Sequence, residues 1–279
     1  AGRHLGLVTA AETANLQETL EYLAQIAEKT IDMQALSVIA KSAPPLVYQE
    51  PKISPIADIT IAVAKDYAFC FYYQDSLELL NELGAKIVTF SPLNDTELPK
   101  CDGLYLGGGY PELYLECLQA NEQMRQSIQQ AIENKLPTIA ECGGFMYLMK
   151  KISDFSGQAF AMTGVVNGVS HMTEKLNRFG YVTLTAQHDN MLGKQGARIN
   201  AHEFHYSDSD CNGNSYLAQK PHGKRSWHCI EATDTLFAGY PHIHLWGNIE
   251  FAKRFVKQCA DYRKKKVSAV HNFRERSNI

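Results

Sequence analysis

Apolar residues along the first part of the chain recur at the spacing of one helix face, as in Leu16, Leu20, Leu23, Ile26 and Ala27. Residues three or four positions apart lie on the same side of an α-helix, so the pattern predicts helix across residues 5–40. A proline-bearing stretch, 42–51, ends it because proline cannot donate a backbone hydrogen bond. We expect a helical segment over residues 1–45 and a linker over 46–58.

A different pattern begins at residue 59, where short apolar runs alternate with amphipathic stretches. The runs predict strands at residues 59–64, 86–90, 103–106 and 137–140, and the stretches between and after them predict helices at 75–83, 121–134 and 143–151. Strands that are apolar throughout are buried on both faces, and helical crossovers make neighbouring strands parallel. The sequence therefore predicts a doubly wound α/β fold with a mostly parallel sheet, whose site lies at the carboxyl ends of the strands.

After residue 158 the runs become shorter and predict an antiparallel extension of this α/β domain. They lie at residues 160–166, 181–186, 202–207 and 228–232, and a last helix is expected from 248 to about 263. The domain should thus cover residues 59–262 and end in a basic tail at 263–279.

Composition narrows the function classes. With 27 Lys and Arg against 30 Asp and Glu, the net charge of −3 argues against nucleic-acid binding through bulk positive charge. We find no apolar run of the roughly 18–20 residues that a membrane helix needs. Seven cysteines without a Cys-x-x-Cys pair favour a reducing, cytoplasmic setting over a disulfide framework or a structural zinc site.

One cysteine lies in an unusual context. Residues 137–148 read Pro-Thr-Ile-Ala-Glu-Cys-Gly-Gly-Phe-Met-Tyr-Leu, a buried strand that runs through Cys142 into two glycines and a helix. A nucleophile on a strained strand-to-helix turn needs small neighbours, and the helix amino terminus is expected to lower the thiol pKa. Cys142 is therefore a candidate nucleophile, although a free cysteine is more commonly a small buried apolar residue.

A run of three glycines, 107–109, follows the preceding predicted strand. Backbone amides in such a loop can approach a ligand closely and form an oxyanion hole beside the thiol. A simple turn is the alternative. A phosphate loop is disfavoured because no Gly-x-x-x-x-Gly-Lys-Ser/Thr motif occurs in the chain.

A thiol nucleophile needs a base, and two histidine pairs are candidates. His242 and His244 share one face if residues 240–246 are extended, and either could act on Cys142 with a carboxylate orienting its ring. The pair in His202-Glu-Phe-His205 leaves two further interpretations open. The four imidazoles could bind a metal, as in a divalent-metal hydrolase, or Glu203 and His205 could form a buried polar pair.

Taken together, the elbow, the glycine loop and a histidine about a hundred positions downstream resemble the class I, or triad, glutamine amidotransferases. Within that class, Leu-Gly-Gly-Gly-Tyr-Pro-Glu-Leu-Tyr at 106–114 and His-Glu-Phe-His-Tyr-Ser at 202–207 resemble the glutaminase domain of the cobyrinate a,c-diamide synthase family, as do residues 68–80 and 171–181. The resemblance spans about residues 59 to 258. Residues 3–9 resemble the tail of that family's ATP-binding domain, whose body we expect to be missing from this chain.

The resemblance implies ATP- and glutamine-dependent amidation of the a and c acetate side chains of a corrinoid. Cys142 would attack the glutamine carboxamide, His242 would activate it, and amides near Gly108, Gly109 and Gly143 would hold the oxyanion. The wider class has a glutamate where this chain has His244, so Glu203 is the candidate orienting carboxylate. No cofactor is expected in this chain, whereas Mg and ATP are expected for the full-length family enzyme.

Two alternatives stay open beside this interpretation. A sibling diamide synthase would act on another tetrapyrrole, such as nickel sirohydrochlorin. A non-catalytic glutaminase-like module would only support a partner protein, although the presence of both Cys142 and His242 argues against it.

Overall fold

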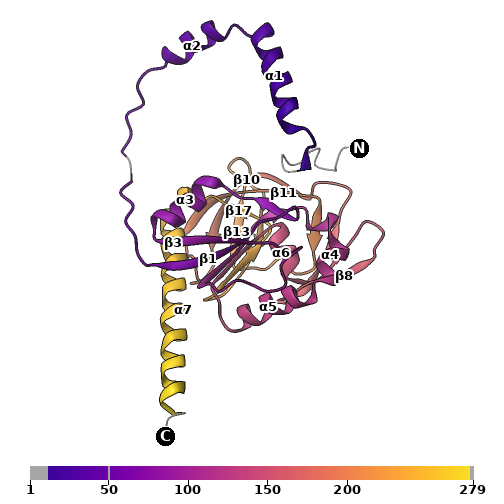
Figure 1. Cartoon of the computed structure of the whole chain (residues 1–279), viewed down its shortest axis with the longest axis vertical. Helices are drawn as coiled ribbons and strands as arrows, with labels where there is room; N and C mark the ends of the chain where they lie inside the picture. The colour runs from indigo at the N-terminus through magenta and orange to yellow at the C-terminus, as the bar shows by residue number, and fades with distance from the viewer. Residues whose placement is uncertain (1–11, 50, 277–279) are drawn as a thin grey trace. The chain divides into compact units, whose positions relative to one another are not determined.

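The computed structural model describes residues 12–49 and 51–276, with side chains described up to residue 268 (Figure 1). Contacts between residues divide the chain into two units, 1–52 and 53–279. Residues 3–9, which carry the resemblance to an ATP-binding domain, lie outside the described residues.

The first unit contains two helices where the apolar spacing predicts one helical stretch. They are α1 (Leu16–Thr30) and α2 (Met33–Lys41). The break falls at Asp32, whose carboxylate accepts a 2.9 Å hydrogen bond from the amide of Ala35 and so caps the start of α2. None of the described residues in either helix is buried.

The second unit is built on a six-stranded sheet in the order β15-β16-β6-β4-β1-β3. Neighbouring strands are parallel except for the edge pair β15–β16. This sheet confirms the predicted mostly parallel α/β fold. The prediction missed β16, a short strand that lies beside β6 inside the sheet. The strands are β1 (Ile59–Ala64), β3 (Ala85–Phe90), β4 (Gly103–Leu106), β6 (Thr138–Glu141), β15 (Glu231–Ala232) and β16 (Leu236–Gly239).

Helices and two apolar cores cover both faces of this sheet (Figure 1). Alternate side chains of β1 point to opposite faces, as a strand requires. Ile61 therefore belongs to the core that contains Phe251 of α7, whereas Ala62 belongs to the core that contains Phe145 of α6. The helices are α3 (Gln74–Glu82), α4 (Leu115–Ala120), α5 (Glu122–Glu133), α6 (Gly143–Leu148) and α7 (Ile249–Arg276), with short 3₁₀ turns η2 (Pro111–Leu113) and η3 (Leu245–Gly247).

The remaining strands form the mostly antiparallel extension. A five-stranded sheet has the order β14-β13-β10-β11-β17, a four-stranded sheet has the order β12-β9-β7-β8, and β2 pairs with β5. Their bounds are β2 (Phe69–Phe71), β5 (Gly108–Gly109), β7 (Met149–Ser153), β8 (Ala159–Ala161), β9 (Val166–Met172), β10 (Arg178–Ala186), β11 (Arg198–His205), β12 (Ser207–Ser209), β13 (Tyr216–Gln219), β14 (Ser226–Cys229) and β17 (His242–Ile243).

Three predicted elements differ from the structure. The helix predicted over 143–151 ends at Leu148, and the chain then enters β7, which pairs with β8 and β9. The single run predicted over 160–166 splits into two strands because Gly164 has a φ of 74°, outside extended geometry. The last helix continues through Arg276, well beyond 263. Among the residues that the structure covers, no helix is long and apolar enough to cross a membrane.

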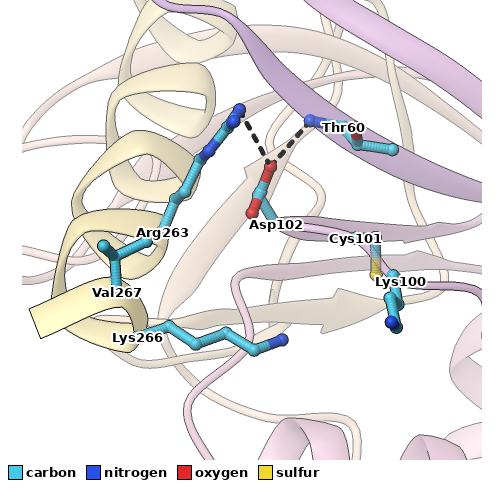
Figure 2. A pocket seen from close by; sticks show the side chains of 7 residues that line it. All are labelled: Thr60, Lys100, Cys101, Asp102, Arg263, Lys266 and Val267. Atoms are coloured by element: carbon cyan, nitrogen blue, oxygen red, sulfur yellow. Dashed lines mark hydrogen bonds and ion pairs between the residues drawn. The ribbon is translucent and has the colours of Figure 1, made fainter. Parts of the chain in front are cut away.

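The long helix α7 is tied to the sheet at a carboxylate (Figure 2). Asp102 accepts a 2.9 Å hydrogen bond from the amide of Thr60 and lies 3.9 Å from the guanidinium of Arg263. A cavity of about 440 Å³ opens here, and Lys100 and Lys266 contribute to its wall. Because Thr60 and Asp102 lie at the amino ends of their strands, this cavity is at the edge of the sheet opposite Cys142.

Candidate active site

Cys142 occupies a strained turn between β6 and α6. Its φ of 47° and ψ of −106° lie outside the regions that residues with a side chain normally adopt. The turn is held in place because the Cys142 amide donates a 2.8 Å hydrogen bond to the carbonyl of Gly239 on β16. A Cβ on Gly144 would lie 2.1 Å from the carbonyl oxygen of Leu106, so only glycine fits there. The geometry is that of a nucleophile elbow.

The environment of the thiol favours its neutral form. Burial raises the pKa of Cys142, the carboxylate of Glu112 raises it further, and a hydrogen bond from the Gly143 amide opposes both. The sequence led us to expect a lowered pKa from the helix amino terminus. That effect is outweighed because α6 is only six residues long and the thiol is desolvated. Cys142 therefore needs a base to become a nucleophile.

His242 begins β17 and is buried. Burial lowers its pKa to about 3, with the neighbouring His202 and His205 acting in the same direction. Its imidazole is consequently neutral and able to accept a proton. The ring rests on the glycine loop, because a Cβ on Gly108 would lie 2.4 Å from His242 Cε1.

The glycine loop lies between the histidine and the elbow. A Cβ on Gly143 would lie 3.1 Å from the amide nitrogen of Gly109, so these two backbones are close. The amide of Gly144 donates to the carbonyl of Gly107, and the amide of Gly107 donates to the hydroxyl of Tyr72 at 2.8 Å. The structure thus brings together Gly108, Gly109 and Gly143, the three glycines singled out from the sequence.

Glu141 provides the carboxylate nearest to His242. Its Oε2 lies 3.9 Å from His242 Nδ1, and both side chains are buried. Its Oε1 accepts a 2.9 Å hydrogen bond from the Ile243 amide, and its Oε2 accepts one of 2.9 Å from the Tyr105 hydroxyl. Burial raises the pKa of Glu141 to about 7, and these two bonds oppose the rise.

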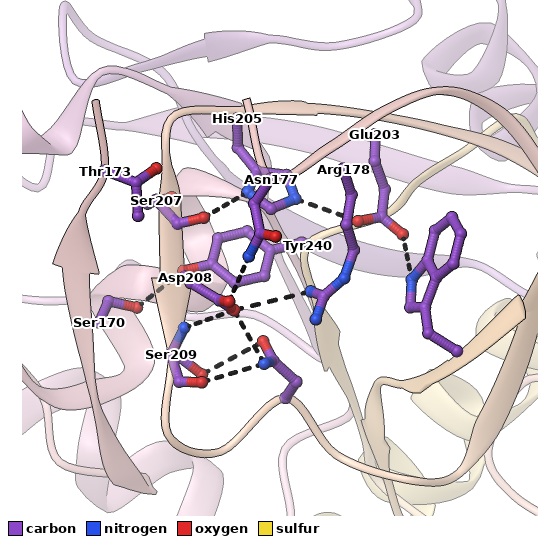
Figure 3. Close-up of polar contacts among 12 residues, drawn as sticks. Ser170, Thr173, Asn177, Arg178, Glu203, His205, Ser207, Asp208, Ser209 and Tyr240 are labelled. Carbon is purple, nitrogen blue, oxygen red and sulfur yellow. Dashed lines mark hydrogen bonds and ion pairs between the residues drawn. The ribbon is translucent and has the colours of Figure 1, made fainter. Parts of the chain in front are cut away.

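Glu203, the sequence candidate for this position, is bound elsewhere (Figure 3). Its Oε2 lies 3.0 Å from His205 Nε2, and its Oε1 accepts a 3.0 Å hydrogen bond from the indole of Trp227. The other ring nitrogen of His205 faces the carbonyl of Ser207 at 2.8 Å. The His205 ring stacks on Tyr240, with 4.0 Å between ring centroids. Glu203 therefore forms the buried polar pair with His205 that the sequence had left open.

His244 points away from the elbow. Its Nε2 lies 2.9 Å from the carboxylate of Asp75, and both side chains are partly exposed. His202 instead faces His242 across the β11–β17 pair, and its Nδ1 lies 2.8 Å from the Tyr73 hydroxyl. In the described part of the chain, no three His, Cys, Asp or Glu side chains are grouped so that they could hold a metal ion.

Sequence reasoning overlooked Glu141 and Tyr105. Glu141 lies in the motif around Cys142, and an acidic residue within an otherwise apolar, fully buried strand could have identified it. Tyr105 carried no local signal, because a tyrosine in a buried apolar strand is ordinary and its partner is 36 positions away.

A parallel sheet with a cysteine elbow after β6 and a histidine beyond the adjacent β16 is typical of class I glutamine amidotransferases. Two solved structures share the fold. PurLQS from Thermotoga maritima matches with a TM-score of 0.52 over 74% of this chain and 99% of its own, at 16% sequence identity. A Thermoplasma acidophilum protein named after GMP synthase matches with a TM-score of 0.51 over 75% of this chain and 98% of its own, at 17% identity.

Residues 60–249 match the CobB/CobQ-like glutamine amidotransferase domain, and the chain belongs to that family. Cobyrinate a,c-diamide synthase of Caldanaerobacter subterraneus subsp. tengcongensis is 41% identical over 266 residues, which cover 94% of this chain and 59% of that protein. The protein of that name from Dehalococcoides mccartyi (strain CBDB1) is 37% identical over 273 residues, covering 93% and 58%. The chain thus spans about three fifths of the length of these curated relatives.

Proposed function

We propose that this chain hydrolyses glutamine with Cys142 as the nucleophile. One observation carries the proposal: Cys142 occupies a positive-φ elbow beside a glycine loop on which His242 rests. The elbow presents the thiol, the loop offers backbone amides, and the neutral imidazole offers a base.

In the proposed reaction the Cys142 sulfur bonds to the carboxamide carbon of glutamine while its proton passes to His242. The developing oxyanion is held by amides near Gly109 and Gly143. The carbon–nitrogen bond then breaks, and His242 returns the proton to the departing ammonia. Water, deprotonated by His242, hydrolyses the glutamyl thioester and releases glutamate and the free thiol.

We further propose that this ammonia serves an ATP-dependent amidation of the a and c acetate side chains of cobyrinate. The two relatives named cobyrinate a,c-diamide synthase, at 41% and 37% identity, support this substrate. A carboxylate must be activated before ammonia can displace an oxygen from it. The 279 residues contain no Gly-x-x-x-x-Gly-Lys-Ser/Thr phosphate loop. We therefore assign binding of ATP, Mg and the corrinoid to the part of such a protein that lies outside this chain.

Covalent labelling tests the glutaminase assignment. The chain is incubated with a diazoketone analogue of glutamine, digested and examined by mass spectrometry. We expect one adduct, on Cys142, that excess glutamine suppresses. Release of ammonia and glutamate from glutamine should disappear in the Cys142→Ser variant.

A matched control is Cys117→Ser, because Cys117 is exposed on α4 and distant from the elbow in the sequence and fold. This variant should be labelled and should hydrolyse glutamine like the wild type. Absence of an adduct on Cys142 at every pH would overturn the assignment and favour a non-catalytic module.

A further inference from the structure

A single carboxylate joins the two strands that carry the reacting residues. Glu141 directly precedes Cys142 on β6, and its Oε1 accepts a hydrogen bond from the amide of Ile243, the residue directly after His242 on β17. Its other oxygen, Oε2, faces Nδ1 of His242 at 3.9 Å. One side chain therefore relates the position of the elbow to that of the imidazole.

Other carboxylates near the site are engaged elsewhere or lie on the wrong side. Both oxygens of Glu203 are bound, one to His205 and one to the indole of Trp227. Asp75 pairs with His244 and is half exposed. Among the ion pairs of the described residues, the carboxylate placed against His242 is that of Glu141.

Resting on the proposed glutaminase function, we propose that Glu141 is the positioning residue for His242 and supplies the carboxylate of a Cys142–His242–Glu141 triad. A carboxylate at Nδ1 keeps the proton on that nitrogen and leaves Nε2 free to take the thiol proton. When His242 becomes an imidazolium, the Glu141 charge stabilises it in a site that water does not reach. The separation of 3.9 Å is longer than a hydrogen bond, as is common before substrate binds.

Tyr105 completes the arrangement from the neighbouring strand β4. Its hydroxyl donates to Oε2, the same oxygen that faces His242, and Tyr105 is almost fully buried. Because Oε1 and Oε2 are each held by a donor, the carboxylate cannot rotate away from the imidazole without losing a buried hydrogen bond. Besides Tyr105 and His242, the titratable groups that interact with Glu141 are Tyr72, Tyr73 and Cys142.

The test compares Glu141→Gln with the wild-type chain in steady-state glutamine hydrolysis between pH 5.5 and 9, on the order of the range where His and Glu side chains of perturbed pKa titrate. Glutamine keeps an acceptor for the Ile243 amide but carries no charge. We expect kcat to fall roughly 100-fold or more while KM for glutamine changes little, because a lost triad carboxylate acts on the transition state. Wild-type kcat should rise as Glu141 ionises around its raised pKa of about 7, and Glu141→Gln should lack this rise.

Glu141→Asp should restore part of kcat and the pH-dependent rise, because it restores the charge. The matched control is Asp102→Asn, which also removes a carboxylate bound to a strand amide but lies at the opposite edge of the sheet. It should leave kcat and its pH profile unchanged.

Wild-type kcat and an unaltered pH profile in Glu141→Gln would overturn the positioning role. Equal losses in Glu141→Gln and Glu141→Asp, with no change in profile, would also overturn it, since they would show a purely structural role. Labelling of Cys142 separates these results from failure of the proposed function: if Cys142 is labelled, only the assignment of Glu141 is wrong.

Discussion

The imidazole rings of His202 and His242 are stacked, with 4.8 Å between their centroids and 15° between their planes. His202 therefore forms one wall of the space in which His242 can turn. His202→Ala removes that wall, and we expect kcat for glutamine hydrolysis to fall roughly 10- to 100-fold because a small misplacement of the base is costly. His202→Phe keeps a stacked ring and should retain most of kcat. Equal losses in the two variants would show that stacking is not what matters.

Glycine at position 108 is required by the ring above it. Gly108→Ala would place a Cβ 2.4 Å from His242 Cε1, so we expect the ring to be displaced and kcat to fall at least about 10-fold. Gly247→Ala is the control, because its Cβ would meet only ordinary contacts, at 3.7 Å and beyond. Circular dichroism should show both variants folded, and an active Gly108→Ala would contradict the contact.

Titration of Glu141 should also be visible in the stability of the fold. Its pKa is raised from 4.5 to about 7, so the folded state binds this proton more tightly than the unfolded chain does. The resulting stability is complete below about pH 4.5 and is lost as pH rises through about 7. The shift corresponds to roughly 3 kcal/mol. In urea unfolding, Glu141→Gln should match the wild type near pH 4.5 and exceed it at pH 8, while a deficit at pH 8 would contradict this linkage.

The strain at the elbow predicts an unusual response to glycine. Cys142→Gly abolishes hydrolysis, yet it relieves a backbone cost of about 1–3 kcal/mol, which offsets the lost side-chain burial. We therefore expect its thermal midpoint to stay within a few degrees of the wild type. Cys229→Gly, at a buried cysteine without a positive φ, should unfold at a clearly lower temperature. A large loss of stability in Cys142→Gly would argue against strain.

Glu203 should matter more for folding than for catalysis. Both ring nitrogens of His205 face oxygen acceptors, which is the hydrogen-bonding pattern of a buried ion pair with Glu203. Glu203→Ala leaves His205 without its partner, and breaking such a pair costs about 3–5 kcal/mol. Measured per folded molecule, its kcat should fall far less than that of Glu141→Gln. The reverse order would restore Glu203 as the orienting carboxylate.

Local patterns were sufficient for the elements that dominate the fold. The apolar runs around Ile61 and Ile139 could be read as buried parallel strands because nothing polar interrupts them. β16 could not, since four residues leave too little pattern and its place beside β6 depends on contacts with a strand about a hundred positions earlier. The same limit applies to β7, where pairing with β8 and β9 ends a helix that the local sequence would continue.

The candidate site divides in the same way. Cys142 and the glycines around it were recognisable because an elbow requires small residues at fixed neighbouring positions. The choice between Glu141 and Glu203 could not be made from sequence, because it depends on which carboxylate the folded chain brings against His242. Both are acidic residues in buried strands, and only their hydrogen-bond partners distinguish them.

The bond between Glu141 and the Ile243 amide connects positions 102 residues apart. During synthesis, the elbow is translated long before the strand that bears His242. A ribosome-bound chain ending anywhere before residue 242 contains the thiol but lacks its base, so it cannot consume free glutamine by this chemistry. The order of strands along the chain therefore delays the activity until most of the domain has been made.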